Sequence, residues 1–203
     1  MTARQRNARG EGARLRDDLL MGAQRILERT GSEDAVTLRA VAREVGVSAP
    51  SIYTHFADGR AIVDAVIEQA FSELVEVLQQ ANDRAPEGER LLALCVAYVR
   101  FGLEHPGRYL TLFQRRRGLE RTRQLEAEAA MFDTGARAFG ILVQGVAETR
   151  GGSADSARED ATLLWMGLHG YVSLRASTPG FSWFADEEGI CRQLVDRVAV
   201  HTG

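Results

Sequence analysis

The amino-acid sequence predicts an all-α fold, and three observations lead to this class. Apolar residues recur at helical spacing along most of the 203-residue chain, which is 45% hydrophobic and therefore able to form a core. Strand-like alternation never extends beyond four residues. Glycine and proline interrupt the helical pattern at intervals that suit helix ends.

The first helix is expected over residues 13–30, because apolar residues there fall on one helical stripe and Gly31 can take the positive φ of a helix end. The stripe consists of Leu15, Leu19, Ile26 and Leu27. Thr37 stands where an N-cap belongs, before a two-turn helix with the sequence LRAVAREV. Its apolar residues Leu38, Val41, Ala42 and Val45 are expected to face inward.

A third, short helix follows directly after the second. Gly46 ends the second helix, Ser48 caps the third, and Pro50 falls in its first turn, where a missing N–H is harmless. Two short helices joined by a turn that contains glycine form a helix-turn-helix pattern. Ile52 and Phe56 have the spacing of core residues in this small unit.

The remaining helices are marked by caps and breakers. Asp58 can cap a fourth helix that extends to about Ala81, and Pro86 with Gly88 breaks the pattern after it. Residues 91–113 are expected to be helical with a division at Pro106. A long helix from about Arg123 to Arg150 ends at Gly151 and Gly152. Ser156 with Glu159 fits a capping box for the next helix, and Asp186 can cap the last one.

The break around Pro86 separates two functional parts of the chain. The first 60 residues hold 10 Arg and 8 acidic residues, a net charge of +2. The remaining residues hold 15 Arg and 20 acidic residues, a net charge of −5, so the total is −3. A basic arm with Arg4, Arg6, Arg9, Arg14 and Arg16 on an acidic body indicates contact with a polyanion.

Other classes of protein have little support in the sequence. Apolar runs are too short for a membrane span and no signal peptide precedes them, so a cytoplasmic protein without membrane contact is expected. The four histidines show no metal-ligand spacing and no catalytic motif is present, so no enzyme activity, metal or cofactor is expected. Cys95 and Cys191 are either buried thiols or, alternatively, a disulfide or thiol sensor.

The third helix carries polar side chains that suit hydrogen bonding to DNA. In a helix-turn-helix, the second helix of the motif enters the major groove. Ser48, Ser51, Thr54 and His55 are short polar groups that can reach phosphates or base edges, and Tyr53 can donate its hydroxyl to a phosphate. No acid lies between Gly46 and Ala57 to repel the backbone. His55 can alternatively stack inward on the first helix.

The motif from Thr37 to Phe56, T-L-R-x-V-A-x-x-V-G-V-S-x-x-S-I-Y-x-H-F, resembles the DNA-binding domain of the TetR family of bacterial transcription regulators. The resemblance implies a homodimer that reads a palindromic double-stranded operator. The family usually has Lys or Arg where this chain has Gly59, and the base appears at Arg60 instead. The positions predicted to contact DNA are Thr37, Arg39, Ser48, Ser51, Tyr53, Thr54, His55 and Arg60.

The stretch LWMGLHGY from Leu164 to Tyr171 resembles the Trp-x-x-x-His-Gly signature of a branch of the family called WHG. Trp165 and His169 share a helix face and are either core residues or ligand contacts. Gly167 and Gly170 are costly inside a helix, which predicts the close approach of another helix, with a partner subunit as the natural neighbour.

The resemblance further implies a DNA-binding domain over residues 12–72 and a C-terminal ligand-binding and dimerisation domain over 73–203, which binds a small molecule and then releases DNA. Aromatic residues from three segments are candidates for the ligand site, although such residues are equally able to form core. The predicted ligand contacts are Phe101, Tyr109, Phe113, Phe132, Trp165 and His169. A ligand-responsive repressor is therefore expected. The alternatives are a ligand-independent regulator or activator of the same fold, and a helical small-molecule-binding protein without DNA function.

Overall fold

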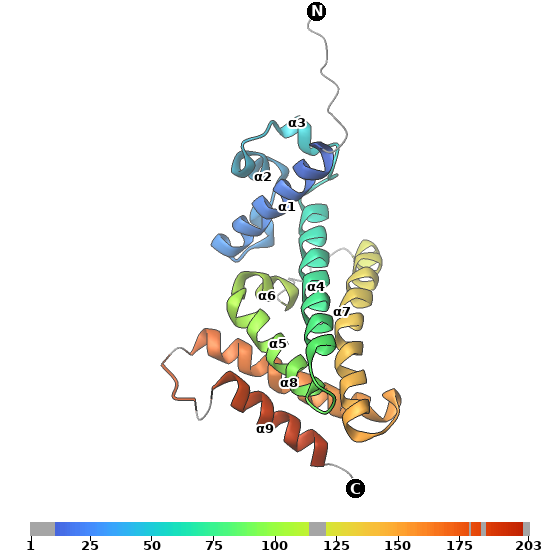
Figure 1. Ribbon diagram of the computed structural model, residues 1–203. Helices are drawn as coiled ribbons and strands as arrows, with labels where there is room; N and C mark the ends of the chain where they lie inside the picture. Colours follow the sequence, from blue (N-terminus) through green and yellow to red (C-terminus); the bar gives the residue numbers. More distant parts are fainter. Residues whose placement is uncertain (1–10, 114–120, 179, 184–185, 201–203) are drawn as a thin grey trace, which may run out of the picture. The chain divides into compact units, whose positions relative to one another are not determined.

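The computed structural model describes residues 11–113, 121–178, 180–183 and 186–200 (Figure 1). Every regular element in these residues is a helix, which confirms the all-α class. The chain divides into two compact units inside the long helix α4, Gly59–Arg84. The N-terminal unit contains the residues up to Gln69, and the C-terminal unit contains most of those from Ala70 onward.

The N-terminal unit gathers the short helices of the predicted motif around the first turns of α4 (Figure 1). Its elements are α1 (Glu11–Thr30), the 3-10 turn η1 (Glu33–Ala35), α2 (Leu38–Val45) and α3 (Ala49–Ile52). The sequence did not predict η1. The core comes from α1, α2, α3 and the turn after α3, and it includes Leu19, Ile26, Val41, Ile52 and Phe56, each at most 5% exposed. Ile52 and Phe56 are thus core residues, as their spacing predicted.

Local chemistry sets the limits of α2. The Thr37 side chain accepts a hydrogen bond from the backbone N–H of Ala40 at 3.1 Å, as an N-cap does. Gly46 ends the helix at φ 77°, a left-handed conformation that glycine adopts without a Cβ penalty. Both features confirm the predicted limits of α2. Helix α3 follows after a three-residue turn and is only four residues long.

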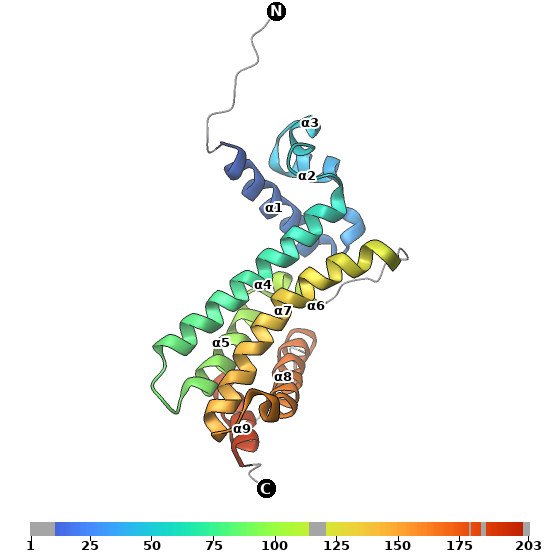
Figure 2. The ribbon, with the colours of Figure 1, turned by 90° about the vertical axis from the view of Figure 1, so that its right-hand side faces the viewer.

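The C-terminal unit is a bundle in which α5 packs against α7, α8 and α9 (Figure 2). Its helices are α5 (Arg90–Glu104), α6 (Pro106–Phe113), α7 (Arg121–Arg150), α8 (Ala154–Ser177) and α9 (Glu187–Val200). Helix α7 also packs against α8 and α9. Cys95 on α5 and Cys191 on α9 are buried, free thiols in this bundle.

The predicted capping box at Ser156 is wrong. Helix α7 ends at Gly151, which has φ 69°, and the N–H of Gly152 donates to the carbonyl of Ala147. Because this turn is tight, helix α8 begins soon after it. Ser153 is therefore the N-cap of α8 and accepts a hydrogen bond from the N–H of Ser156. Asp186 does cap α9, since its carboxylate accepts from the N–H of Gly189 at 2.8 Å.

The prediction of a neighbouring helix is right for Gly167 but wrong for the identity of that helix. A Cβ on Gly167 would lie 3.0 Å from a methyl of Leu194, which belongs to α9 of the same chain. A Cβ on Gly170 would meet nothing of this chain within 4 Å. Gly167 therefore allows α9 to approach α8, whereas Gly170 leaves an open surface.

Gly59 is the tightest backbone approach in the N-terminal unit. A Cβ at this position would lie 2.0 Å from the carbonyl oxygen of Val36 and 3.2 Å from the Cα of Thr37. Both are backbone atoms next to the start of α2, and Val36 itself is buried. No side chain larger than hydrogen fits there, so α4 can begin against α2 only with glycine.

We predict that Gly59→Ala lowers the free energy of unfolding by about 1–3 kcal/mol, because the added methyl forces two backbone segments apart. Gly140→Ala is the matched control: Gly140 is exposed in α7 and has open space around it. That change should stabilise the protein by up to about 1 kcal/mol, since alanine is the better helix former. Urea unfolding followed by far-UV circular dichroism measures both. Equal effects from the two changes would contradict the packing argument.

Candidate nucleic-acid interface and C-terminal site

The exposed surface of α3 and of the turn after it is polar. Ser48 and Ser51 share a hydrogen bond between their hydroxyl oxygens at 2.8 Å, and the Thr54 hydroxyl donates to the carbonyl of Ser51 at 2.8 Å. Tyr53 is 63% exposed, a large fraction for an aromatic ring that packs on no core. These groups form one surface patch that water or a ligand can reach.

His55 differs from its neighbours because it is only partly exposed. A Cβ built on Gly12 would lie 3.9 Å from Cε1 of His55, so the imidazole lies beside the first turn of α1. The ring thus lies near the first helix, as the alternative to a DNA contact predicted. Its role toward DNA stays a prediction.

The other predicted DNA contacts are exposed. Thr37 and Arg39 lie at the start of α2, and Arg60 lies in the first turn of α4. Asp58 caps α4 by accepting from the N–H of Ala61 at 2.8 Å. Since position 59, between Asp58 and Arg60, must be glycine, the basic side chain of this helical turn is that of Arg60. Arg4, Arg6 and Arg9 of the basic arm lie outside the described residues.

Glu44 joins α2 to α1 by two ion pairs. Its carboxylate accepts from Arg25 at 3.1 Å and from Arg29 at 3.1 Å. These hydrogen bonds lower the pKa of the Glu44 carboxyl. Nearby, the guanidinium of Arg16 lies 5.2 Å from the centre of the Phe56 ring, a cation–π distance. Three arginines of this unit therefore have partners within the protein.

A partly buried chain of hydrogen bonds joins side chains of the C-terminal unit. The indole N–H of Trp165 donates to the Tyr98 hydroxyl at 3.1 Å, Tyr98 bonds the Tyr109 hydroxyl at 2.9 Å, and Tyr109 bonds Nδ1 of His169 at 2.6 Å. The chain joins α5, α6 and α8. The rings of Tyr109 and His169 also stack, with centroids 5.5 Å apart.

The direction of the protons in this chain follows from donor counting. Trp165 can only donate, so Tyr98 accepts from it and uses its own hydrogen for Tyr109. Tyr109 then donates to Nδ1 of His169, which must be unprotonated. Burial favours that state, because it lowers the pKa of His169. Burial also raises the pKa of Tyr98 to about 12 and that of Tyr109 further, so both phenols stay neutral.

The predicted ligand residues are only partly brought together. Tyr109, Trp165 and His169 meet in the chain, and the sequence missed Tyr98, whose spacing is that of any core residue on α5. The Phe139 ring is also near this chain, with its centroid 6.2 Å from that of Trp165. Phe101 is buried on α5 and contacts the His105 ring. Phe113 is half-buried at the end of α6. The side chain of Phe132 lies outside the described residues.

Two family models match the chain, and together they cover both units. One, described as bacterial regulatory proteins of the tetR family, matches residues 20–66. The other, described as the tetracyclin repressor-like C-terminal domain, matches residues 91–198, more than half of the chain. The chain belongs to the TetR family. It is therefore a transcription regulator with a helix-turn-helix DNA-binding domain, in which α2 and α3 are the motif.

Known proteins similar to this TetR family member agree with that assignment. An uncharacterised HTH-type transcriptional regulator of Mycobacterium tuberculosis is 25% identical over 91% of this chain and 79% of its own length. A Rhodococcus protein of unknown function has a solved structure with a TM-score of 0.69 and 28% identity, covering 98% of this chain and 97% of that one. The TetR family regulator PfmR of Thermus thermophilus has a TM-score of 0.66 and 16% identity, covering 91% and 98%.

Membership of the WHG branch stays a prediction, because the matching C-terminal model is described only as tetracyclin repressor-like. None of the helices in the described ranges has the length and apolar character of a membrane span. Within the same residues, no group of three or more His, Cys, Asp or Glu side chains is placed to hold a metal ion.

We predict that Tyr109→Phe destabilises the C-terminal unit, because it leaves the Tyr98 hydrogen and Nδ1 of His169 without their partner. Each buried polar group left unpaired costs about 1–3 kcal/mol. Trp165 and Trp183 are the two tryptophans of the sequence and both belong to this unit, so urea unfolding followed by indole fluorescence reports on it.

The control is Tyr53→Phe, the same chemical change at an exposed position of the other unit. It should alter stability by at most about 0.5 kcal/mol. A Tyr109→Phe protein with the unfolding midpoint of the wild type would show that the chain adds nothing to stability.

Proposed function

We propose that this TetR family protein is a ligand-responsive repressor, released from a palindromic operator by a small hydrophobic or aromatic molecule. The observation that carries the proposal is the chain of Trp165, Tyr98, Tyr109 and His169, which places four neutral polar groups among aromatic rings inside the unit remote in sequence from the DNA-binding motif. We retain residues 12–72 as the DNA-binding domain, 73–203 as the ligand-binding and dimerisation domain, and the cytoplasm as the location.

On the DNA side, Ser51 is proposed to meet a base edge and Tyr53 a phosphate. A serine hydroxyl both donates and accepts, so it suits several base edges, while an exposed phenol is long enough to reach the backbone. Breaking the Ser48–Ser51 bond would free both hydroxyls for DNA. The remaining proposed contacts are Thr37, Arg39, Thr54, His55 and Arg60.

On the effector side, Tyr109 and His169 are proposed as the polar contacts that orient the ligand. Ligand pockets are mostly apolar with a few placed polar groups, and Phe101, Phe113, Phe132 and Trp165 would supply apolar surface. The described polar groups of the chain are neutral at pH 7, so they favour a flat or hydrophobic organic molecule over a metal ion or a sugar.

Helix α6 offers a route from the effector to α4. Two neighbouring residues of α6 face different helices: Tyr109 bonds His169 on α8, and Arg108 donates to Glu73 on α4 at 2.6 Å. A ligand that takes the place of Tyr109 on His169 would shift α6 and, through Arg108, displace α4. Helix α4 begins in the DNA-binding unit, so its movement would change the spacing of two recognition helices, which must lie about 34–36 Å apart on a palindrome.

The proposed dimer uses the outer face of α8. Leu163, Met166 and Leu174 are 59%, 59% and 52% exposed, and with Gly170 they follow the i, i+3, i+7, i+11 spacing of one helix stripe. The opposite face of α8 is buried in the unit by Leu164, Leu168 and others. An exposed apolar stripe with an open glycine suits a second copy of the same helix.

One observation favours the ligand-independent alternative. The four groups of the hydrogen-bonded chain already bond to one another, so the chain can stabilise the unit without any effector. A regulator or activator that responds to no small molecule would keep this arrangement permanently. The small-molecule-binding protein without DNA function is no longer a candidate, because the family is one of DNA-binding regulators.

We predict that Met166→Glu converts the dimer to a monomer, because two buried carboxylates would face each other across a symmetric apolar interface. Leu110→Glu is the control, since Leu110 is 44% exposed but lies on α6. Sedimentation velocity distinguishes the two states. If the Met166 variant dimerises as tightly as the wild type, the interface lies elsewhere.

We predict that an aromatic or lipophilic compound that raises the melting temperature also weakens operator binding by about 5- to 150-fold, the usual range of coupling between two sites. The operator is first selected from randomised duplexes. Glu73→Gln should bind the same compound normally but lose most of this coupling, because the link from α6 to α4 is gone. Glu148→Gln is the control, as Glu148 pairs with Arg90 away from α6.

If every stabilising compound leaves operator affinity unchanged, the protein is a ligand-independent regulator. If Glu73→Gln keeps the full coupling, the effector acts by a route other than Arg108.

A further inference from the structure

Some arginines of the N-terminal unit have partners within the protein, and others have none that the structure describes. Arg25 and Arg29 are committed to Glu44, and Arg16 lies over Phe56. Arg39 and Arg43 on α2 are exposed, and no acidic side chain among the described residues pairs with either. Since Glu44 is the only acid on α2, the exposed side of this helix carries positive charge alone.

Helix α2 has three distinct sides. Leu38, Val41 and Ala42 are buried in the core. Glu44 faces α1 through its two ion pairs. Arg39 and Arg43, four residues apart, share the remaining side, where like charges at this spacing repel each other by about 0.2–0.5 kcal/mol. Because no acidic side chain among the described residues offsets the positive charges of Arg39 and Arg43, a bound polyanion would stabilise the pair.

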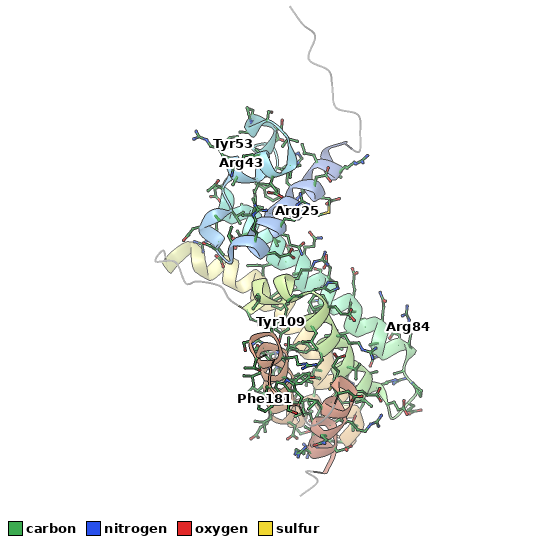
Figure 3. The ribbon with its side chains drawn as sticks, turned by 90° about the vertical axis from the view of Figure 1, so that its left-hand side faces the viewer. Arg25, Arg43, Tyr53, Arg84, Tyr109 and Phe181 are labelled. Carbon is green, nitrogen blue, oxygen red and sulfur yellow. The ribbon has the colours of Figure 1, made fainter. Side chains whose placement is uncertain are left out.

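We propose that Arg43 is a further DNA-positioning residue, which binds a backbone phosphate next to the one held by Arg39. In a helix-turn-helix the first helix crosses the DNA backbone while the second enters the groove. Here α2 is that first helix. In the view of Figure 3, Arg43 and Tyr53 lie at the end of the unit that carries α3, while Arg25 lies further from that end.

The restriction of position 59 to glycine explains why a cation at Arg43 matters for DNA binding. Because the carbonyl of Val36 excludes any side chain at position 59, the first position of α4 cannot hold a base. The cationic contacts of this unit must then come from other exposed positions. Arg43 supplies one from the end of α2 opposite to Thr37, so that the backbone is held at both ends of this helix.

A phosphate contact positions the protein without reading sequence. Loss of Arg43 should therefore weaken binding to every duplex alike, and an operator is not needed to measure it. Each phosphate neutralised contributes about 0.9 to the slope of log K against log salt, so one lost contact weakens binding about 8-fold at 0.1 M salt relative to 1 M. A dimer with both subunits bound loses about twice that slope.

The experiment measures fluorescence anisotropy of a mixed-sequence duplex of about 30 base pairs, long enough for two half-sites, with the full chain over a range of salt. Arg43→Gln should raise Kd and reduce the slope by about 0.9 per bound subunit, whereas Arg43→Lys, which keeps the charge, should restore both. Arg25→Gln is the matched control, because Arg25 is held by Glu44 and should leave Kd and slope unchanged.

Two outcomes overturn the proposal. Arg43→Gln with the Kd and slope of the wild type shows that Arg43 meets no phosphate. A lysine variant as weak as the glutamine variant shows that the effect comes from packing rather than charge. Arg43 also lies in the last turn of α2, where a cation favours the helix dipole. Far-UV circular dichroism of each variant therefore verifies that α2 is intact, and the lysine variant carries the test if the glutamine variant unfolds.

Discussion

The hydrogen-bonded chain from Trp165 to His169 is the constraint on which the C-terminal unit depends. It joins three helices through groups that are costly to bury alone, so α5, α6 and α8 can pack together only in the register that pairs all of them. Gly102 allows this register, since a Cβ there would lie 2.5 Å from Val172 on α8 and 2.9 Å from the Tyr109 ring on α6. The same chain makes the interior polar without charge, which is the property that a site for a neutral organic molecule needs.

The N-terminal unit is under a different constraint, because it must expose cations to DNA and still remain folded. Glu44 forms ion pairs with Arg25 and Arg29 of α1, and the guanidinium of Arg16 lies over the Phe56 ring. These charges therefore join parts of the protein to one another. The arginines on the outer side of α2 have no such partners among the described residues. Gly59 meanwhile brings α4 against the start of α2. Internal pairing therefore decides which of many arginines are available to a polyanion.

The sequence predicted the features that depend on neighbouring residues and missed those that depend on distant ones. Thr37, Gly46 and Asp186 act within a few residues of themselves, so their caps were predictable. The start of α8 was misplaced because Ser153 and Ser156 both suit an N-cap, and only the turn at Gly151 decides between them. The bonds of Tyr98, the obstruction at Gly59 and the contact of Gly167 with Leu194 all involve residues at least 11 positions apart. No local pattern marks such contacts.

Helix α6 illustrates how this difference bears on regulation. Tyr109 was selected from the sequence for its aromatic ring, yet its part in the unit comes from the bond to His169, 60 residues away, and Arg108 gains significance only through Glu73, 35 residues away. Both bonds are short, and neighbouring residues of one two-turn helix make them. A movement of α6 that breaks the first bond cannot leave the second unchanged, because eight residues are too few to bend between adjacent positions without loss of the helix. One short helix thus makes a bond to α8 and a bond to α4 from adjacent residues.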